Sequence, residues 1–237
     1  MFISKFDNIL GKDALASIRK IVETSKFVDG RISGGNARDK NNLELAPETE
    51  KYVEVVNIIE RAVRDHVELN LTSFPRYMTR PIISRYEVGM FYKEHVDLPV
   101  MGFMSADRTM GRWLSPVGLN YVRSDLSMTL FLSDPESYGG GELTFEGAVG
   151  ATRVKLDAGS AILYPTGSRH SVAPITRGVR YAGILWIQTL FPTEAHRQAV
   201  YDARRLLEMI AKIAPQSEAH DLAQESFYNL CRILAEV

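Results

Sequence analysis

Residues 84–97 read Ser-Arg-Tyr-Glu-Val-Gly-Met-Phe-Tyr-Lys-Glu-His-Val-Asp. The stretch starts with the alternating residue character of a β-strand, breaks at Gly89 and ends in His95-Val96-Asp97. Side chains two residues apart on an extended chain point to the same side, so the His95 imidazole and the Asp97 carboxylate can reach a common point. The stretch therefore predicts a strand that carries two potential metal ligands at its end.

A second histidine, His170, lies far downstream beside another predicted strand. Two histidines and one carboxylate on neighbouring strands would occupy one face of a metal ion and leave the other positions open. This facial triad is typical of non-haem iron(II) oxygenases. A His-x-Asp tripeptide alone is frequent in surface loops, so the prediction of a triad of His95, Asp97 and His170 depends on the residues around it.

From Met78 onward, short strand patterns alternate with turn residues such as Gly139-Gly140-Gly141. The predicted strands cover residues 82–87, 92–95, 126–132, 142–146, 152–156, 160–164, 170–175 and 180–188. Eight strands in two sheets would form a jelly roll, the cupin-like double-stranded β-helix. We therefore expect a mainly β fold with flanking helices.

Helical periodicity precedes and follows the strands. It covers residues 14–24 and 47–69 before them, and residues 194–213 and 217–237 after them. We expect residues 1–77 to form an N-terminal helical support layer that makes one domain with a jelly-roll core at residues 78–191. Residues 192–237 are expected to form a C-terminal helical pair as an appendage.

Composition restricts the class of protein. The chain has 237 residues, a formal net charge of -1 and a single cysteine, Cys231. Near-neutral charge gives no general attraction to nucleic acid or to an anionic membrane. There is no apolar run of membrane-spanning length, no signal-peptide pattern at the start and no possible intrachain disulfide. We expect a soluble cytoplasmic protein without nucleic-acid or membrane partners.

Five spaced motifs together resemble a known family. They are Arg-Tyr-x-x-Gly-x-x-Tyr-x-x-His-x-Asp at 85–97, Asp-Leu-Ser-x-Thr-Leu-Phe-Leu-Ser at 125–133, Gly-Gly-Glu-Leu at 140–143, His-x-Val-x-Pro-x-Thr-Arg-Gly-x-Arg at 170–180 and Trp-Ile-Gln at 186–188. The chain resembles the PKHD-type hydroxylases, bacterial iron(II)- and 2-oxoglutarate-dependent dioxygenases related to prolyl 4-hydroxylases. The resemblance covers the whole chain and is densest between residues 85 and 188.

The resemblance implies an enzyme with Fe(II) at His95, Asp97 and His170, 2-oxoglutarate as co-substrate, and ascorbate as a further cofactor. It implies hydroxylation of an unactivated C–H bond with release of succinate and CO2. The substrate is expected to be an amino acid, a peptidyl residue or a secondary metabolite. The C-terminal helical pair is expected to be used in homodimerisation.

The distal carboxylate of 2-oxoglutarate needs a fixed cation, and the planar fork of arginine can give it two charge-assisted hydrogen bonds. Arg180 opens an inward-facing strand and matches the family's co-substrate arginine, whereas Arg177 lies in the preceding turn and is expected to face water. Tyr86 stands where the family carries a tyrosine near the co-substrate. Tyr92 is either a second co-substrate contact or a wall residue.

Further expectations concern the strands and the long connection around this site. Residues 127–130 alternate between polar and apolar side chains. Either Ser127 and Thr129 or their apolar neighbours, Met128 and Leu130, should therefore face the interior. Trp186 is expected in the core. Residues 98–125 are too long and too rich in aromatic residues and methionine for a simple turn. We expect them to form a lid or substrate loop, the alternative being a merely packed excursion. Its apolar residues are Met101, Phe103, Met104, Met110 and Trp113.

Two alternatives to an oxygenase stay open on the residues alone. A cupin-type metal-dependent isomerase or lyase would keep His95 and His170 but would not need Arg180. A non-catalytic, ligand-binding jelly roll would need neither open metal positions nor a cation for a chelating co-substrate.

Overall fold

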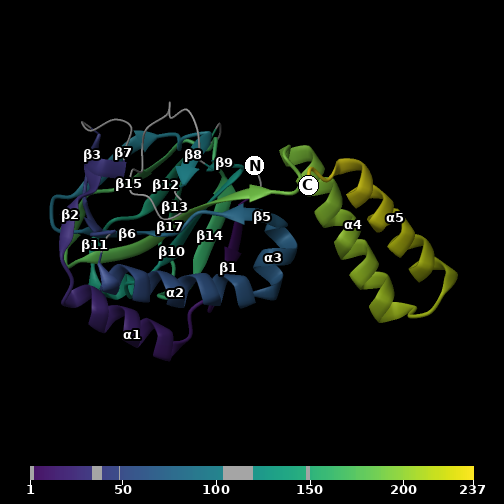
Figure 1. The fold of residues 1–237 in the computed structure, drawn as a ribbon, viewed down its shortest axis with the longest axis horizontal. Coiled ribbons are helices and arrows are strands. Elements are labelled where there is room, and N and C mark those ends of the chain that lie inside the picture. Colours follow the sequence, from purple (N-terminus) through teal and green to yellow (C-terminus); the bar gives the residue numbers. More distant parts are fainter. Residues whose placement is uncertain (1–2, 34–38, 48, 104–119, 148–149) are drawn as a thin grey trace.

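The computed structural model describes residues 3–33, 39–47, 49–103, 120–147 and 150–237. Within these residues, eight strands form a major antiparallel sheet with β17 near its centre (Figure 1). In spatial order its main path is β1 (Ser4–Phe6), β14 (Ala161–Pro165), β10 (Leu126–Phe131), β17 (Arg180–Thr189), β6 (Ile82–Tyr86), β4 (Leu43–Leu45) and β2 (Phe27–Asp29), with β5 (Pro75–Met78) also paired to β17.

A second antiparallel sheet of five described strands faces the first. Its order is β13 (Gly150–Val154), β12 (Leu143–Gly147), β15 (His170–Val172), β7 (Phe91–His95) and β3 (Lys40–Asn41). Two short pairs complete the strands, β11 (Gly139–Gly140) with β16 (Ile175–Arg177) and β8 (Val100–Phe103) with β9 (Asn120–Arg123). The two facing sheets form the expected double-stranded β-helix, and the predicted fold class is confirmed.

Strand alternation divides the core into two layers. On β10, Met128 and Leu130 belong to the cluster under the helices, whereas Phe131 belongs to the cluster between the sheets. Ser127 and Thr129 are buried on the face opposite to Met128 and Leu130, since neighbouring residues of a strand point to opposite sides. Because both faces of β10 are covered, every residue of this strand is buried.

The helices α1 (Lys12–Glu23), α2 (Glu50–Asp65) and α3 (Val67–Ser73) cover the outer face of the major sheet (Figure 1). The prediction of one helix over residues 47–69 was wrong. The helix breaks at His66, whose backbone is extended and whose Nδ1 accepts a hydrogen bond from the Leu69 amide at 3.1 Å. His66 therefore caps a second helix, a role that an uninterrupted apolar periodicity does not reveal.

The C-terminal helices α4 (Glu194–Ile213) and α5 (Glu218–Leu234) form an antiparallel hairpin beside the sheets (Figure 1). The hydroxyls of Thr193 and Ser217 cap their first turns. The bounds of α4 agree with the sequence prediction. None of the described helices combines the length and the apolar character needed to cross a membrane.

Two other predicted segments differ from the structure. The expected strand over residues 170–175 is divided into β15 and β16, since Pro174 between them has no amide hydrogen to donate to a ladder. The expected loop over residues 98–125 begins and ends in the paired strands β8 and β9, in which Val100 faces Arg123. The remaining part of the proposed lid, with Met104, Met110 and Trp113, lies outside the described residues.

Candidate active site

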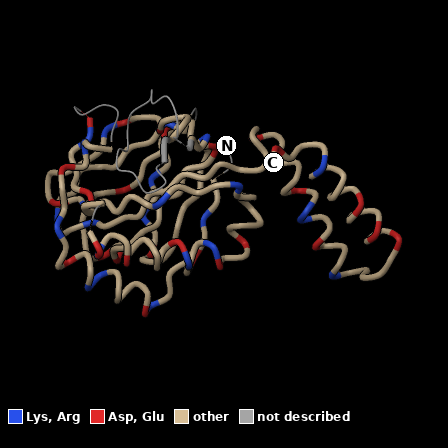
Figure 2. Tube along the Cα trace, viewed as in Figure 1, with Lys and Arg blue, Asp and Glu red and all other residues tan. Residues whose placement is uncertain are grey.

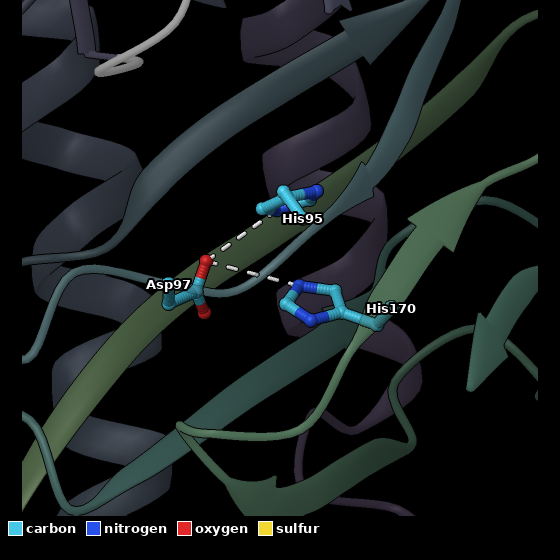
Figure 3. Close-up of side chains that lie close together, drawn as sticks. All are labelled: His95, Asp97 and His170. Atoms are coloured by element: carbon cyan, nitrogen blue, oxygen red, sulfur yellow. Dashed lines mark ion pairs between the residues drawn. The ribbon is translucent and has the colours of Figure 1, made fainter. Parts of the chain in front are cut away.

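The strands β7 and β15 bring three potential metal ligands together. His95 ends β7 and faces His170 across the strand pair, and Asp97 follows two residues later. One ligand atom from each lies within 4.8 Å of the others (Figure 3). Asp97 Oδ1 is 3.5 Å from His95 Nε2 and 3.8 Å from His170 Nε2. The structure therefore gathers His95, Asp97 and His170 around one point, and their role as metal ligands stays a prediction.

Backbone carbonyls fix which nitrogen of each imidazole is free. His95 Nδ1 lies 2.7 Å from the Lys93 carbonyl, and His170 Nδ1 lies 2.9 Å from the Ser168 carbonyl. A carbonyl oxygen can only accept, so each Nδ1 carries the hydrogen when the ring is neutral. The lone pairs on both Nε2 atoms then point towards Asp97, which is the tautomer a metal site requires.

Asp97 is oriented by two hydrogen bonds to one of its oxygens. Its Oδ2 accepts from the Ser127 hydroxyl at 2.8 Å and from the indole Nε1 of Trp186 at 2.9 Å. Thr166 Oγ1 lies 3.1 Å from the Ser127 hydroxyl. Burial alone would raise the pKa of Asp97, but bonding to His95, the neighbouring His170 and these two donors together lower it below 3.8. The carboxylate stays charged, with Oδ1 left for a cation.

Trp186 is therefore more than the core residue that we expected. Its place on β17 shares strand parity with Arg180, and this parity was a usable signal that its side chain faces the site. The sequence left open whether Ser127 or its apolar neighbour Met128 faces the interior between the sheets. In the structure Ser127 does, and its partner residue on β17 is Trp186.

His170 is buried between the sheets. Burial lowers its pKa from the ordinary value of 6.5, although the charge of Asp97 acts in the opposite direction. The Tyr164 hydroxyl lies 3.5 Å from His170 Nε2. A neutral, preoriented imidazole can bind a metal near neutral pH without first losing a proton.

Arg180, at the start of β17, is 1% exposed. Its guanidinium lies over the rings of Tyr86 and Phe131, at 5.3 and 5.5 Å from their centroids. Its Nε and Nη2 are buried and have no hydrogen-bond partner among the described residues. By contrast, Arg177 is exposed and donates from Nη2 to the Glu136 carbonyl at 3.0 Å. Of these two arginines, Arg180 is therefore the one that offers buried, unused donors.

Two tyrosines lie beside the Arg180 guanidinium. Tyr86 pairs with Arg180 across β6 and β17, and burial raises its pKa well above 10, so its phenol keeps its hydrogen. Sequence reasoning missed Tyr138, whose buried hydroxyl is close to Arg180 but meets full hydrogen-bond geometry with no described residue. Burial raises the pKa of Tyr138, opposed by the charge of Arg180. Its position directly before the Gly139–Gly140 strand was the available signal.

Gly141 allows Arg180 to pack in this place. It has a φ of +68°, and a Cβ added to it would lie 2.4 Å from Ile175 Cδ1 and 3.0 Å from Arg180 Cδ. Any larger residue would strain the backbone and push against the arginine. The glycine-rich turn therefore leaves room for the Arg180 side chain as well as reversing the chain.

Tyr92 lies on the other side of the triad. Its ring stacks on His95 with centroids 3.6 Å apart, which agrees with the wall-residue alternative. Burial raises the pKa of Tyr92 to about 12. Behind it, Lys40 Nζ lies 5.3 Å from the Tyr92 ring centroid and 2.6 Å from Glu44 Oε1. Sequence reasoning missed this buried ion pair, and the polar stretch around it gave no signal of burial.

Comparisons with known proteins agree with this geometry. Residues 81–188 match the model of the 2OG-Fe(II) oxygenase superfamily. A PKHD-type hydroxylase of Klebsiella pneumoniae (strain 342) is 35% identical over 233 residues, covering 97% of each chain. The PKHD-type hydroxylase YbiX of Escherichia coli O1:K1 / APEC is 33% identical over 231 residues, again covering 97% of each chain.

Two solved structures share the fold. A prolyl hydroxylase from Trichoplax adhaerens, in complex with a peptide fragment of hypoxia inducible factor, has a TM-score of 0.56 and 14% identity. That match covers 84% of this chain and 86% of the other. A Pseudomonas putida prolyl-4-hydroxylase has a TM-score of 0.50 and 19% identity, covering 79% of this chain and 92% of the other.

These matches favour an oxygenase over a cupin-type isomerase or a binding module. With 35% identity to a relative over 97% of both lengths, the chain belongs to the PKHD-type hydroxylases, within the 2OG-Fe(II) oxygenase superfamily.

Proposed function

We propose that this enzyme hydroxylates an unactivated C–H bond of an amino acid, a peptidyl residue or a secondary metabolite. The reaction would consume 2-oxoglutarate and dioxygen and release succinate and CO2. The observation that carries the proposal is a triad of His95, Asp97 and His170 in the same interior as Arg180, whose buried donors are unused. A cation site and an anion site beside the same core cluster between the sheets suit a chelating dicarboxylate.

The donor set of the triad fits Fe(II). Two neutral imidazoles and one carboxylate are the ligands of the facial triad, and all three present a free atom to one point. Bound Fe(II) would supply the redox chemistry that activates dioxygen. The chain's own contribution is orientation, because the Lys93 and Ser168 carbonyls hold the imidazoles and Trp186 holds the carboxylate.

Arg180 suits the distal carboxylate of 2-oxoglutarate. A carboxylate can accept from both unused donors, which would then exchange an unsatisfied buried state for two charge-assisted hydrogen bonds. The phenols of Tyr86 and Tyr138 lie beside the guanidinium and retain their hydrogens. We propose Arg180 and Tyr86 as co-substrate residues, with Tyr138 as an addition and Tyr92 as a wall of the metal site.

The decisive experiment is anaerobic addition of Fe(II) and then 2-oxoglutarate to the purified protein. A weak visible charge-transfer band is expected for the wild type and not for His170→Ala. A protein that binds Fe(II) but never develops the band would contradict the co-substrate assignment. A band without succinate formation in air across a broad metabolite and peptide screen would contradict the hydroxylase activity.

Substrate, ascorbate and location need separate measurements. Succinate release scored over free amino acids, peptides and secondary metabolites would identify the substrate class. Turnover with and without ascorbate would test the proposed ascorbate requirement, and no dependence would remove it. Fractionation of cells would test the predicted cytoplasmic location.

A further inference from the structure

A buried ion pair lies next to the strand that ends in His95. Charged residues of both signs are spread along the helices and strands of the molecule (Figure 2). Lys40 and Glu44 differ from a solvated pair, because only 7% and 4% of their side chains is exposed. The Ser33 hydroxyl joins them, since it accepts from Lys40 Nζ at 2.7 Å and donates to Glu44 Oε1. These three residues form what we call the buried charge cluster.

The buried charge cluster links the two facing sheets. Lys40 belongs to β3 of the five-stranded sheet, where it lies opposite Tyr92 on β7. Glu44 belongs to β4 of the major sheet, where it lies opposite Ser84 on β6. Desolvation of two buried charges offsets most of their attraction, so such a pair adds little to stability. Its position between β7 and β6 is therefore the more informative feature.

The metal ligands depend on the spacing of the same two sheets. His95 and His170 lie on β7 and β15 of the five-stranded sheet. Asp97 is held by Ser127 on β10 and by Trp186 on β17, both in the major sheet. A shift of β7 relative to the major sheet would therefore move the imidazoles relative to the carboxylate.

A β-bulge turns Tyr92 and His95 to the same face of β7. His170 lies opposite His95 and Val172 lies opposite Tyr92, so two steps along β15 match three steps along β7. Three steps along a regular strand would point the two side chains to opposite faces, and the extra residue of the bulge cancels this reversal. The bulge also interrupts the hydrogen-bond ladder beside His95, so the ladder alone constrains His95 less than a regular strand would.

Stacking on Tyr92 supplies a further constraint on His95. The two ring centroids are 3.6 Å apart, with 16° between the ring planes. The Lys93 carbonyl holds only His95 Nδ1, and one hydrogen bond leaves the imidazole free to turn about it. His170 is buried and has the Tyr164 ring beside it, whereas His95 is half-buried. The plane of the His95 ring is therefore set largely by Tyr92.

Lys40 holds the Tyr92 ring from the neighbouring strand. Side chains directly opposite each other on paired strands lie on one face, and Lys40 Nζ is 5.3 Å from the Tyr92 ring centroid. The quadrupole of a tyrosine ring attracts a cation over its face, more strongly where water is excluded. Glu44 fixes the ammonium in this place and neutralises its charge, which would otherwise repel a metal cation nearby.

We propose that Lys40 is a positioning residue for the metal ligand His95. With its ammonium held by Glu44, Lys40 fixes the Tyr92 ring, and Tyr92 fixes the plane of the His95 imidazole before a metal ion binds. The proposal rests on the proposed Fe(II) site and extends it to residues outside the ligand set.

The first test removes both charges together. Lys40→Met/Glu44→Leu leaves no unpaired charge buried, so its free energy of unfolding in urea should equal or exceed that of the wild type. Its affinity for Fe(II), measured by competition with a chelator, should nevertheless fall about tenfold. Lys40→Arg/Glu44→Asp keeps a cation beside the ring and the combined length of the two side chains, so its affinity should stay close to that of the wild type.

A double-mutant cycle shows whether Lys40 acts through Tyr92. Tyr92→Leu should lower the Fe(II) affinity at least as much as Lys40→Met/Glu44→Leu does. The triple variant should lose no more affinity than Tyr92→Leu alone, because both changes remove the same constraint on His95. Losses that add would show that Lys40 acts without Tyr92, and they would overturn the proposal.

A second readout needs no metal. The Tyr92 ring should shift the imidazole proton resonances of His95 in the NMR spectrum of the metal-free protein, and comparison with His95→Gln identifies these resonances. In Lys40→Met/Glu44→Leu they should move towards their positions in the unfolded chain. Resonances that stay in place would contradict the assigned function of Lys40, whereas a wild type without affinity for Fe(II) would contradict the metal site itself.

The matched control is the exposed ion pair between Arg169 and Glu94. These residues directly precede His170 and His95, so their pair spans the same two strands. Arg169→Met/Glu94→Gln should leave both the Fe(II) affinity and the His95 resonances unchanged. An equal effect in this control would show a general sensitivity of β7 to lost ion pairs, and it would overturn the proposal. Wild-type Fe(II) affinity in Lys40→Met/Glu44→Leu would do the same.

Discussion

Arg180 is predicted to lower the stability of the ligand-free protein. It is buried with Nε and Nη2 unsatisfied, and its positive charge has no counter-ion among the described residues. Replacing it by methionine keeps an unbranched side chain of similar length and removes the charge. We expect Arg180→Met to raise the stability of the ligand-free protein while abolishing its response to 2-oxoglutarate.

The magnitude follows from two opposing contributions. Each unsatisfied buried donor costs about 1–3 kcal/mol, so two together destabilise the protein by roughly 2–6 kcal/mol. The contacts with the rings of Tyr86 and Phe131 return about 0.5–2 kcal/mol each. At the middle of both ranges, the net gain on substitution is about 1–2 kcal/mol, or a rise in Tm of roughly 2–8 °C for a chain of this length.

The assay is thermal unfolding of the metal-loaded protein under nitrogen, with and without 2-oxoglutarate. The wild type should gain stability with 2-oxoglutarate, and Arg180→Met should start higher and gain nothing. Arg177→Met is the control, since Arg177 is exposed and donates only to the Glu136 carbonyl. A lower Tm for Arg180→Met together with retained 2-oxoglutarate stabilisation would refute the reasoning, because Arg180 would then be a structural residue.

Three further predictions concern the triad. His95→Ala, Asp97→Ala and His170→Ala should each remove tight Fe(II) binding while circular dichroism stays unchanged, and near-normal succinate production by any of them would contradict its assignment as a ligand. Trp186→Phe should keep the aromatic packing of this position but lose the hydrogen bond to Asp97 Oδ2. The affinity for Fe(II), measured by competition with a chelator, should then fall about 10- to 100-fold. An unchanged affinity would show that Ser127 alone orients the carboxylate. Burial lowers the pKa of His170 from 6.5, so the unfolded chain binds a proton at His170 more readily than the folded chain does. The stability of the metal-free protein should therefore be fully present above about pH 6.5 and should fall as the pH drops below it. Urea unfolding at pH 7.5 and 5.5 should show a smaller pH dependence of stability for His170→Gln than for the wild type, and an equal dependence would remove His170 as its cause.

Much of the fold could be predicted because its strands alternate and its turns contain glycine. The strands that escaped prediction, such as β1 and β4, have three residues each, which is too few for a periodic pattern to be recognised. They are strands because the edge of the major sheet offers them backbone partners, which is a tertiary cause. The break at His66 escaped for a similar reason, since its cap depends on a local hydrogen bond rather than on periodicity.

The triad could be predicted because side chains two residues apart on a strand, such as His95 and Asp97, point to the same side. The environment of the ligands could not be predicted in the same way. The bond from Trp186 to Asp97 joins strands that are distant in sequence, and only the register of β10 with β17 brings Ser127 beside the same carboxylate. Charged residues usually indicate solvent, so the buried pair of Lys40 and Glu44 had no pattern that could reveal it.

The pairing of His95 with His170 across β7 and β15 has a consequence for folding kinetics. The unfolded chain offers only the local pair of His95 and Asp97, so the complete ligand set exists only after strands far apart in sequence have joined. Such non-local pairing is the slow part of β-rich folding. A metal ion that binds only the fully assembled site should leave the refolding rate unchanged and slow the unfolding rate. The whole binding free energy of the metal then appears as a higher free-energy barrier to unfolding.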